Sequence, residues 1–267
     1  MIEYFLKKLW LKAPLSWAII RAPECELLSK QEFKHPIMEI GCGDGLVTQI
    51  IFKNKKMSVD LGIDLFPLEL KRAEKTRLYK KVAHIDVTNS SLKTHSFSTI
   101  FANGVMEHIP DLDRALSEIT RILKKGGYFI STSPMDSYTG HLAYYRLFTF
   151  LGLKPLATLY GNWINKTFAH YHLYGSKVWR QKLKKAGLKL ETYSFYNPPS
   201  TILIHDLFFP FAVGMKSLKD NTDKMVLFEP LRKIVLLPLA AFFSNFQKIS
   251  DKNENQFSSI LLVAKKV

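Results

Sequence analysis

The chain has few cysteines and no long apolar run. Its two cysteines, Cys25 and Cys42, are too few for a disulfide framework, and no cysteine–histidine cluster has the spacing of a zinc site. The longest apolar stretch, residues 234–243, is too short for a spanning helix, which needs about 18 residues. Lysines interrupt the first apolar residues, so no secretory signal is expected. We therefore expect a protein of the reducing cytoplasm.

Acidic residues are scarce relative to basic ones. The 267 residues include 38 lysines and arginines against 23 aspartates and glutamates, which gives a formal net charge of +15. This balance leaves nucleic acid, anionic lipid and anionic small molecules open as partners. Because 47% of the residues are hydrophobic, the chain can form a core, and its length fits one large α/β domain.

Short apolar runs alternate with amphipathic stretches along much of the chain. Residues 110–125 form the clearest helical pattern, because their apolar side chains recur at the spacing of one helix face. The alternation predicts a mostly parallel sheet with helices on both faces. The expected strands are residues 36–40, 58–64, 82–86, 97–103, 126–133, 188–196 and 257–266, and the expected helices are residues 45–54, 67–81, 110–125 and 176–187.

Three glycines follow the first expected strand in the segment EIGCGDGL. Gly41, Gly43 and Gly45 would form a turn whose backbone N–H groups and following helix dipole face a ligand. Asp44 would repel a pyrophosphate, and no Gly-Lys-Ser/Thr follows, so the loop suits a ligand with little phosphate character. A second interpretation is that the glycines only allow tight packing of strand and helix.

Two aspartates follow the next two expected strands. Asp64 ends the second strand, 19 residues after Gly45, where a carboxylate can accept hydrogen bonds from both ribose hydroxyls. Asp86 ends the third strand at the same edge of the sheet and could accept from an adenine amino group. Each aspartate could instead cap a helix or form a turn. With the loop, they predict an adenosine-type ligand.

The ordered motifs EIGCGDG, GIDLF, HIDV, VMEHIPD and RILKKGGYFIST resemble a class I S-adenosylmethionine-dependent methyltransferase of the type 11 kind. The resemblance covers residues 33–134 closely and 171–197 loosely. It implies a Rossmann-like α/β fold with a seven-stranded, mostly parallel sheet and a reversed final hairpin. It also implies S-adenosyl-L-methionine as the cofactor.

The resemblance also implies which residues would bind this cofactor. The glycine loop, with Glu39 bracing it, would close over the methionine and ribose part. Asp64 with Leu65 would hold the ribose. Asp86 with Val87 would bind the adenine, and Asn103 and Gly104 would lie near the methionine moiety. The full expected set is Glu39, Gly41, Gly43, Gly45, Asp64, Leu65, Asp86, Val87, Asn103 and Gly104.

Three residues are candidates for acid–base work, which is needed only if the acceptor must lose a proton. His108 is the nearest by sequence, although it could simply hold its loop by hydrogen bonds. Tyr171 and His172 stand where similar proteins place groups that face the substrate. In related quinone O-methyltransferases a metal-binding carboxylate precedes the Glu-His pair by three residues. Gly104 occupies that position here, so we expect no metal.

The remaining segments are more apolar than exposed loops should be. We expect a single methyltransferase domain over residues 1–267, with its core at 33–134, hairpin strands at 188–196 and 257–266, and apolar cap insertions at 134–170 and 198–252. The first ten residues place Ile2, Phe5, Leu6, Leu9 and Trp10 on one helical face, which is typical of an interfacial helix.

These segments lead to one main hypothesis and several rivals. The main one is a peripheral methyltransferase at the inner face of the membrane, acting on a small or lipid-linked, amphipathic acceptor; a soluble cap or a dimer contact would explain the same segments. An RNA methyltransferase would use the charge of +15, although no separate RNA-binding module is visible. An NAD-dependent enzyme and a non-catalytic binding protein that kept the fold also remain open. The oligomeric state is not indicated.

Overall fold

The computed structural model describes residues 1–212, 215–226, 232–234 and 237–267. Chain contacts divide these residues into two compact units. One unit contains residues 31–136, 168–194 and 259–267, and the other contains residues 1–30, 137–167 and 195–258. We call them the sheet unit and the helical unit. The expected single domain with a core and cap insertions stays a prediction, and the helical unit contains most of both expected insertions.

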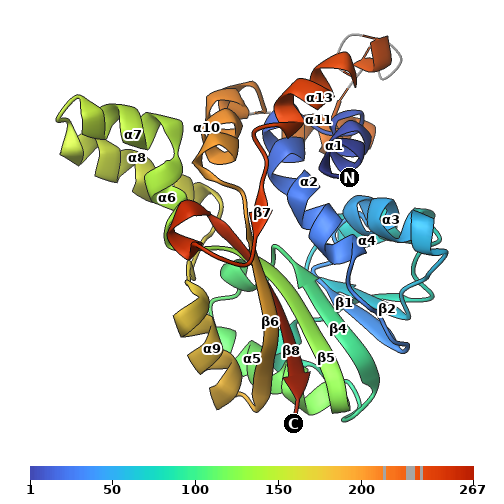
Figure 1. Cartoon of the computed structure of the whole chain (residues 1–267). Helices are drawn as coiled ribbons and strands as arrows, with labels where there is room; N and C mark the ends of the chain where they lie inside the picture. Colours follow the sequence, from blue (N-terminus) through green and yellow to red (C-terminus); the bar gives the residue numbers. More distant parts are fainter. Residues whose placement is uncertain (213–214, 227–231, 235–236) are drawn as a thin grey trace. The chain divides into compact units, whose positions relative to one another are not determined.

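The sheet unit alternates strands and helices as the sequence indicated (Figure 1). β1 and β2 are buried along their whole length, which is typical of parallel strands covered on both faces. Its strands are β1 (Ile37–Ile40), β2 (Leu61–Asp64), β3 (Val82–His84), β4 (Phe97–Asn103), β5 (Leu123–Pro134), β8 (Ser259–Lys266) and most of β6 (Leu188–Tyr196). Its helices are α3 (Leu46–Phe52), η1 (Lys53–Lys55), α4 (Pro67–Lys75), η2 (Val87–Asn89), η3 (Met106–His108), α5 (Leu112–Ile122) and α9 (Ser176–Lys185).

The strand order is β3-β2-β1-β4-β5-β8-β6-β7, with β7 at Ile249–Ser250. β1 pairs in parallel with β2 and β4, and β5 pairs antiparallel with β8. The Rossmann-like α/β class is therefore confirmed. The expected count of seven strands is corrected to eight among the described residues, because the two residues of β7 pair with the end of β6.

In the helical unit, residues 137–167 of the first expected insertion contain three helices. Tyr144 and Phe148 of α7 pack their rings against Tyr160 of α8, which joins the two helices as a hairpin. The unit's helices are α1 (Ile2–Trp10), α2 (Leu15–Ser29), α6 (Tyr138–His141), α7 (Ala143–Phe150), α8 (Lys154–Thr167), α10 (Pro199–Phe208), η4 (Phe209–Ala212), α11 (Met215–Thr222), α13 (Leu237–Ser244) and η5 (Glu254–Gln256).

The first helix does not present its apolar face to a membrane. Phe5, Leu6, Leu9 and Trp10 are all buried, and the Trp10 ring meets Phe243 of α13 edge to face at 5.5 Å. The amphipathic pattern is thus covered from within the helical unit, and the prediction of an interfacial α1 is wrong. None of the described helices is long and apolar enough to cross a membrane.

Candidate cofactor site and active site

The glycine loop lies between β1 and α3, where all three glycines have a positive φ. A Cβ on Gly41 would lie 2.4 Å from a methyl carbon of Val105, and one on Gly45 would lie 2.9 Å from the Tyr79 ring. Tight packing therefore explains these two glycines. It does not explain Gly43, because no atom lies within 4 Å of the position that its Cβ would take. At Gly43 the backbone borders open space, as a ligand site requires.

Glu39 connects β1 to the helix that follows the loop. Its buried carboxylate accepts hydrogen bonds from the Thr48 hydroxyl on α3 and from the Tyr79 hydroxyl, both at 2.7 Å. Burial, together with the Glu39 charge, raises the pKa of Tyr79 well above its usual value, so the phenol remains a donor to Glu39. Burial likewise raises the pKa of the Cys42 thiol, which makes Cys42 a poor nucleophile.

Asp64 connects the end of β2 to the glycine loop. One carboxylate oxygen accepts a hydrogen bond from the Gly43 N–H at 2.8 Å, and the other accepts one from the Phe66 N–H at 2.9 Å. Each oxygen keeps a second lone pair with which it could accept a ribose hydroxyl. Leu65 and Phe66 are exposed beside it and provide an apolar surface for the flat part of a nucleoside.

Asp86 forms a turn, which was one of the alternatives for this residue. One of its oxygens accepts hydrogen bonds at 2.8 Å from both the N–H and the hydroxyl of Thr88, the second residue of η2. The carboxylate is exposed, so this turn does not prevent its other oxygen from accepting an adenine amino group. Val87 is buried behind it.

Asn103 and Gly104 lie at the end of β4 and are hydrogen-bonded to β5. The Thr132 hydroxyl donates to the Asn103 side-chain oxygen at 3.1 Å, and the Gly104 N–H donates to the Thr132 hydroxyl at 3.0 Å. The loop, Asp64, Asp86 and Asn103 follow the carboxyl ends of four adjacent strands, which is where ligands bind in open α/β sheets. The observed cradle fits an adenosyl cofactor, and the individual binding roles stay predictions.

The candidate acid–base residues lie together in the sheet unit. Residues 169–172 are tied to η3, since the Tyr171 and His172 N–H groups approach the Glu107 carbonyl oxygen at 2.8 and 3.3 Å. The His108 ring stacks on His170 with a centroid distance of 5.5 Å. The structure thus joins two segments that are 60 residues apart in the sequence.

His108 has the better arrangement for a base. Its Nδ1 lies 3.2 Å from the Ala169 carbonyl oxygen, which can only accept, so Nδ1 carries the proton in the neutral ring. Nε2 then keeps its lone pair and lies 3.7 Å from the buried Glu107 carboxylate. A proton taken up at Nε2 would be stabilised by this negative charge. The sequence analysis assigned Glu107 no role, although it stands next to His108 in VMEHIPD.

His172 and Tyr171 are less suited to this work. Nε2 of His172 donates to the Pro110 carbonyl oxygen at 3.1 Å, and Nδ1 lies 3.0 Å from the Tyr174 hydroxyl, so both ring nitrogens are engaged. The exposed Tyr171 ring remains available to contact an acceptor. Among the described residues, no group of three or more histidine, cysteine or acidic side chains could hold a metal ion.

Comparison with known proteins decides the family of this site. A family described as methyltransferase domain matches residues 38–131, which contain the loop, Asp64, Asp86, Asn103 and His108. By this match, residues 38–131 are a methyltransferase domain. The cofactor of such a domain is S-adenosylmethionine, and the open space at Gly43 lies within the matched residues.

Each of the curated relatives matches about 38% of the chain. A reducing polyketide synthase of Preussia isomera is 31% identical over 110 residues, which is 38% of this chain and 5% of the relative. The ubiquinone biosynthesis O-methyltransferase of Vibrio cholerae is 23% identical over 104 residues, which is 38% of this chain and 42% of that enzyme. The chain therefore spans less than half the length of either relative.

Solved structures share the fold over most of the chain. A possible histamine N-methyltransferase of Thermotoga maritima has a TM-score of 0.58 at 16% identity. The aligned region covers 95% of this chain and 92% of that protein. Geranyl diphosphate C-methyltransferase of Streptomyces coelicolor has a TM-score of 0.53 at 14% identity. The aligned region covers 95% of this chain and 84% of that enzyme. At such identities the similarity shows the fold alone.

Proposed function

We propose that the protein transfers a methyl group from S-adenosylmethionine to an amphipathic acceptor with an apolar tail, at the surface of a membrane. The observation that carries the proposal is the cradle at Gly43 and Asp64 in a methyltransferase domain. The cofactor supplies an activated methyl group on a sulfonium. The loop and Asp64 hold and orient it, and positioning of donor and acceptor accounts for much of the rate.

His108 would serve as the general base when the acceptor is a hydroxyl or an amine. Nε2 would take the proton that the acceptor's oxygen or nitrogen loses when that atom receives the methyl group, which the cofactor would supply. Glu107 would stabilise the resulting positive charge at 3.7 Å, and the Ala169 carbonyl fixes the ring orientation.

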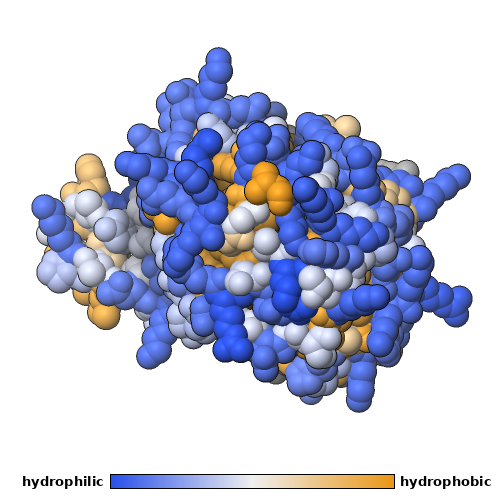
Figure 2. Space-filling model, turned by 90° about the horizontal axis from the view of Figure 1, so that it is seen from below, coloured by the Kyte–Doolittle hydropathy of each residue, from blue (hydrophilic) through white to orange (hydrophobic). Residues whose placement is uncertain are grey.

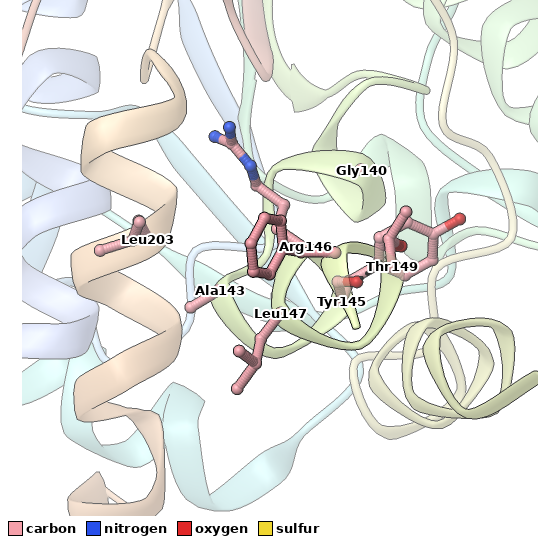
Figure 3. A pocket seen from close by; sticks show the side chains of 8 residues that line it. Gly140, Ala143, Tyr145, Arg146, Leu147, Thr149 and Leu203 are labelled. Atoms are coloured by element: carbon pink, nitrogen blue, oxygen red, sulfur yellow. Dashed lines mark hydrogen bonds between the residues drawn. The ribbon is translucent and has the colours of Figure 1, made fainter. Parts of the chain in front are cut away.

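A groove in the helical unit supports an acceptor with an apolar tail. It has a volume of about 660 Å³, which is the size of many small-molecule sites. Leu203 on α10 lies across it from Ala143 and Leu147 on α7, and Arg146 adds a cation (Figure 3). An isoprenoid or acyl chain with an anionic group suits this lining. The geranyl diphosphate methyltransferases among the structural neighbours act on a substrate of this kind.

The test is calorimetric binding of S-adenosylhomocysteine to the wild type and to Asp64→Asn. Loss of a hydrogen bond to a carboxylate should weaken binding roughly tenfold or more. The matched control is Glu32→Gln, an exposed carboxylate in the segment that precedes β1, which should bind as the wild type does. Thermal unfolding of both variants checks that the fold is retained.

The acceptor class is tested with radiolabelled S-adenosylmethionine and a cell extract. Label that enters the chloroform phase supports the amphipathic acceptor, and label confined to water-soluble products or RNA contradicts it. A chain that binds neither S-adenosylhomocysteine nor NAD would be a non-catalytic relative, and the proposal would fail.

A further inference from the structure

The α7–α8 hairpin exposes apolar side chains to an unusual extent. All of residues 149–156 are exposed, and Phe150 retains 87% of its surface at the turn between the two helices. Hydrophobic side chains are visible on this hairpin at the left of Figure 2. The exposed large apolar residues of the hairpin are Leu147, Phe150, Leu151, Leu153, Leu156, Leu159 and Trp163.

The packing of α7 on α8 uses other side chains, apart from Trp163, whose ring meets those of Tyr160 at 5.8 Å and Phe209 at 6.3 Å. Tyr144 and Phe148 of α7 face Tyr160 of α8, and Ala157 and Ile164 are buried. Among the described residues, the hairpin therefore has an inner packed face and a second face whose leucines and Phe150 are exposed. Exposed apolar patches of this kind mark interaction sites, since exposure to water is unfavourable.

The charge around the hairpin indicates what covers that face. No aspartate or glutamate occurs between Asp136 and Glu191, whereas Arg146, Lys154 and Lys166 all lie on the hairpin and are exposed. Basic residues next to exposed Phe, Leu and Trp side chains are the combination that binds the interface of an anionic bilayer. A second copy of the hairpin would bring like charges together, which disfavours self-association through this face.

We propose that the α7–α8 hairpin docks the protein on an anionic membrane surface, with the turn at Phe150 and Leu151 inserted among the lipid headgroups and chains. The proposal rests on the membrane location in the proposed function. It assigns membrane binding to the hairpin instead of to α1. Each cation near an anionic surface is worth roughly a fivefold change in binding, so Arg146, Lys154 and Lys166 add to the contribution of the apolar side chains.

The experiment is flotation of the full chain with phosphatidylcholine vesicles, with and without phosphatidylglycerol. We expect binding only to the anionic vesicles, weakened by salt but not abolished. The variant Phe150→Ser/Leu151→Ser should reduce this binding at least tenfold. The matched control is Leu239→Ser/Phe242→Ser on α13, which removes one exposed leucine and one exposed phenylalanine from the same unit and should bind like the wild type.

A charge-matched pair completes the design. Lys154→Gln/Lys166→Gln should weaken binding more than tenfold, and Lys124→Gln/Lys125→Gln, two exposed lysines of β5, should have a much smaller effect. Wild-type protein that ignores anionic vesicles would overturn the proposal, and so would equal losses in the α13 control. A dimer in sedimentation that Phe150→Ser/Leu151→Ser dissociates would assign the face to a second copy instead. Binding of S-adenosylhomocysteine, measured on every variant, separates failure of docking from failure of the proposed function.

Discussion

At the scale of single residues, the site depends on a few carboxylates with distinct tasks. Glu39 and Asp64 are buried or nearly so, and each has both oxygens engaged by the loop or by its supports. Glu107 is buried beside His108. A buried carboxylate needs such partners, because an unpaired charge away from water is costly. Each of these three carboxylates therefore lies next to the hydrogen-bond donors or the imidazole ring that can stabilise its charge.

The first prediction concerns His108. His108→Gln should lower the rate of methyl transfer to a hydroxyl acceptor by about 10²-fold or more, because Gln cannot take up a proton. Its affinity for S-adenosylhomocysteine should stay nearly the same, because Ala169 and Glu107, which lie next to its ring nitrogens, are outside the glycine loop. Single-turnover kinetics and calorimetry measure the two effects separately. His172→Gln is the comparison, and an equal loss of rate there would contradict the choice of His108.

At the scale of elements, the loop between β1 and α3 combines two kinds of glycine. Gly41 is needed because the Val105 side chain occupies the space where a Cβ would go. Gly43 has room for a Cβ but has a φ of +51°, and it faces open space. The same motif therefore serves packing at one position and ligand approach at another.

This difference gives an element-scale prediction. Gly43→Ala should cost about 1 kcal/mol of folding free energy, from the positive φ, yet weaken S-adenosylhomocysteine binding at least tenfold, because the added methyl enters the space open to the ligand. Gly41→Ala should destabilise the fold more, because its Cβ would meet Val105 at 2.4 Å.

The control for the loop is a double variant. Val105→Ala combined with Gly41→Ala should recover part of the lost stability in chemical denaturation, since the clash is removed. The same Val105→Ala change should do nothing for the binding defect of Gly43→Ala. Rescue of binding there would show that both glycines act through packing alone.

At the scale of the whole molecule, the proposed function is divided between two compact units. The sheet unit holds the cofactor cradle and His108, and the helical unit holds the groove and the α7–α8 hairpin. Such a division separates the common chemistry of methyl transfer from the recognition of a particular acceptor. Variation in the helical unit can then change the acceptor without altering the cradle.

Hydrogen exchange tests this division. Saturation with S-adenosylhomocysteine should slow amide exchange in residues 41–46, 62–66 and 86–88, because ligand binding suppresses the local opening of the segments it contacts. Exchange in α7 and α8 should stay unchanged. Mass spectrometry of peptides from the two units gives both results in one experiment, and protection that appears first in α7 would contradict the assignment of the cofactor to the sheet unit.

Much of the cofactor site could be predicted from the sequence because its parts are local. A strand, a glycine turn and a helix start are encoded within ten residues, and Asp64 and Asp86 follow the next two strands. Parallel strands bring such ends to one edge of a sheet whatever the loops between them are. The β-strand pattern likewise indicated every strand except β7, which is only two residues long.

The tertiary structure alone decided which apolar faces are covered. The amphipathic pattern of α1 predicts an apolar face but not its partner; the neighbouring α2 covers it together with α13, which comes from near the other end of the chain. The pattern of residues 147–163 is also amphipathic, yet Leu147, Phe150, Leu151 and Leu159 stay exposed in the part of the chain that the structure describes. The same reasoning applies to Glu107, whose burial next to His108 depends on the fold. Periodicity reports that a face is apolar, and only the packing of distant segments determines whether that face is core or surface.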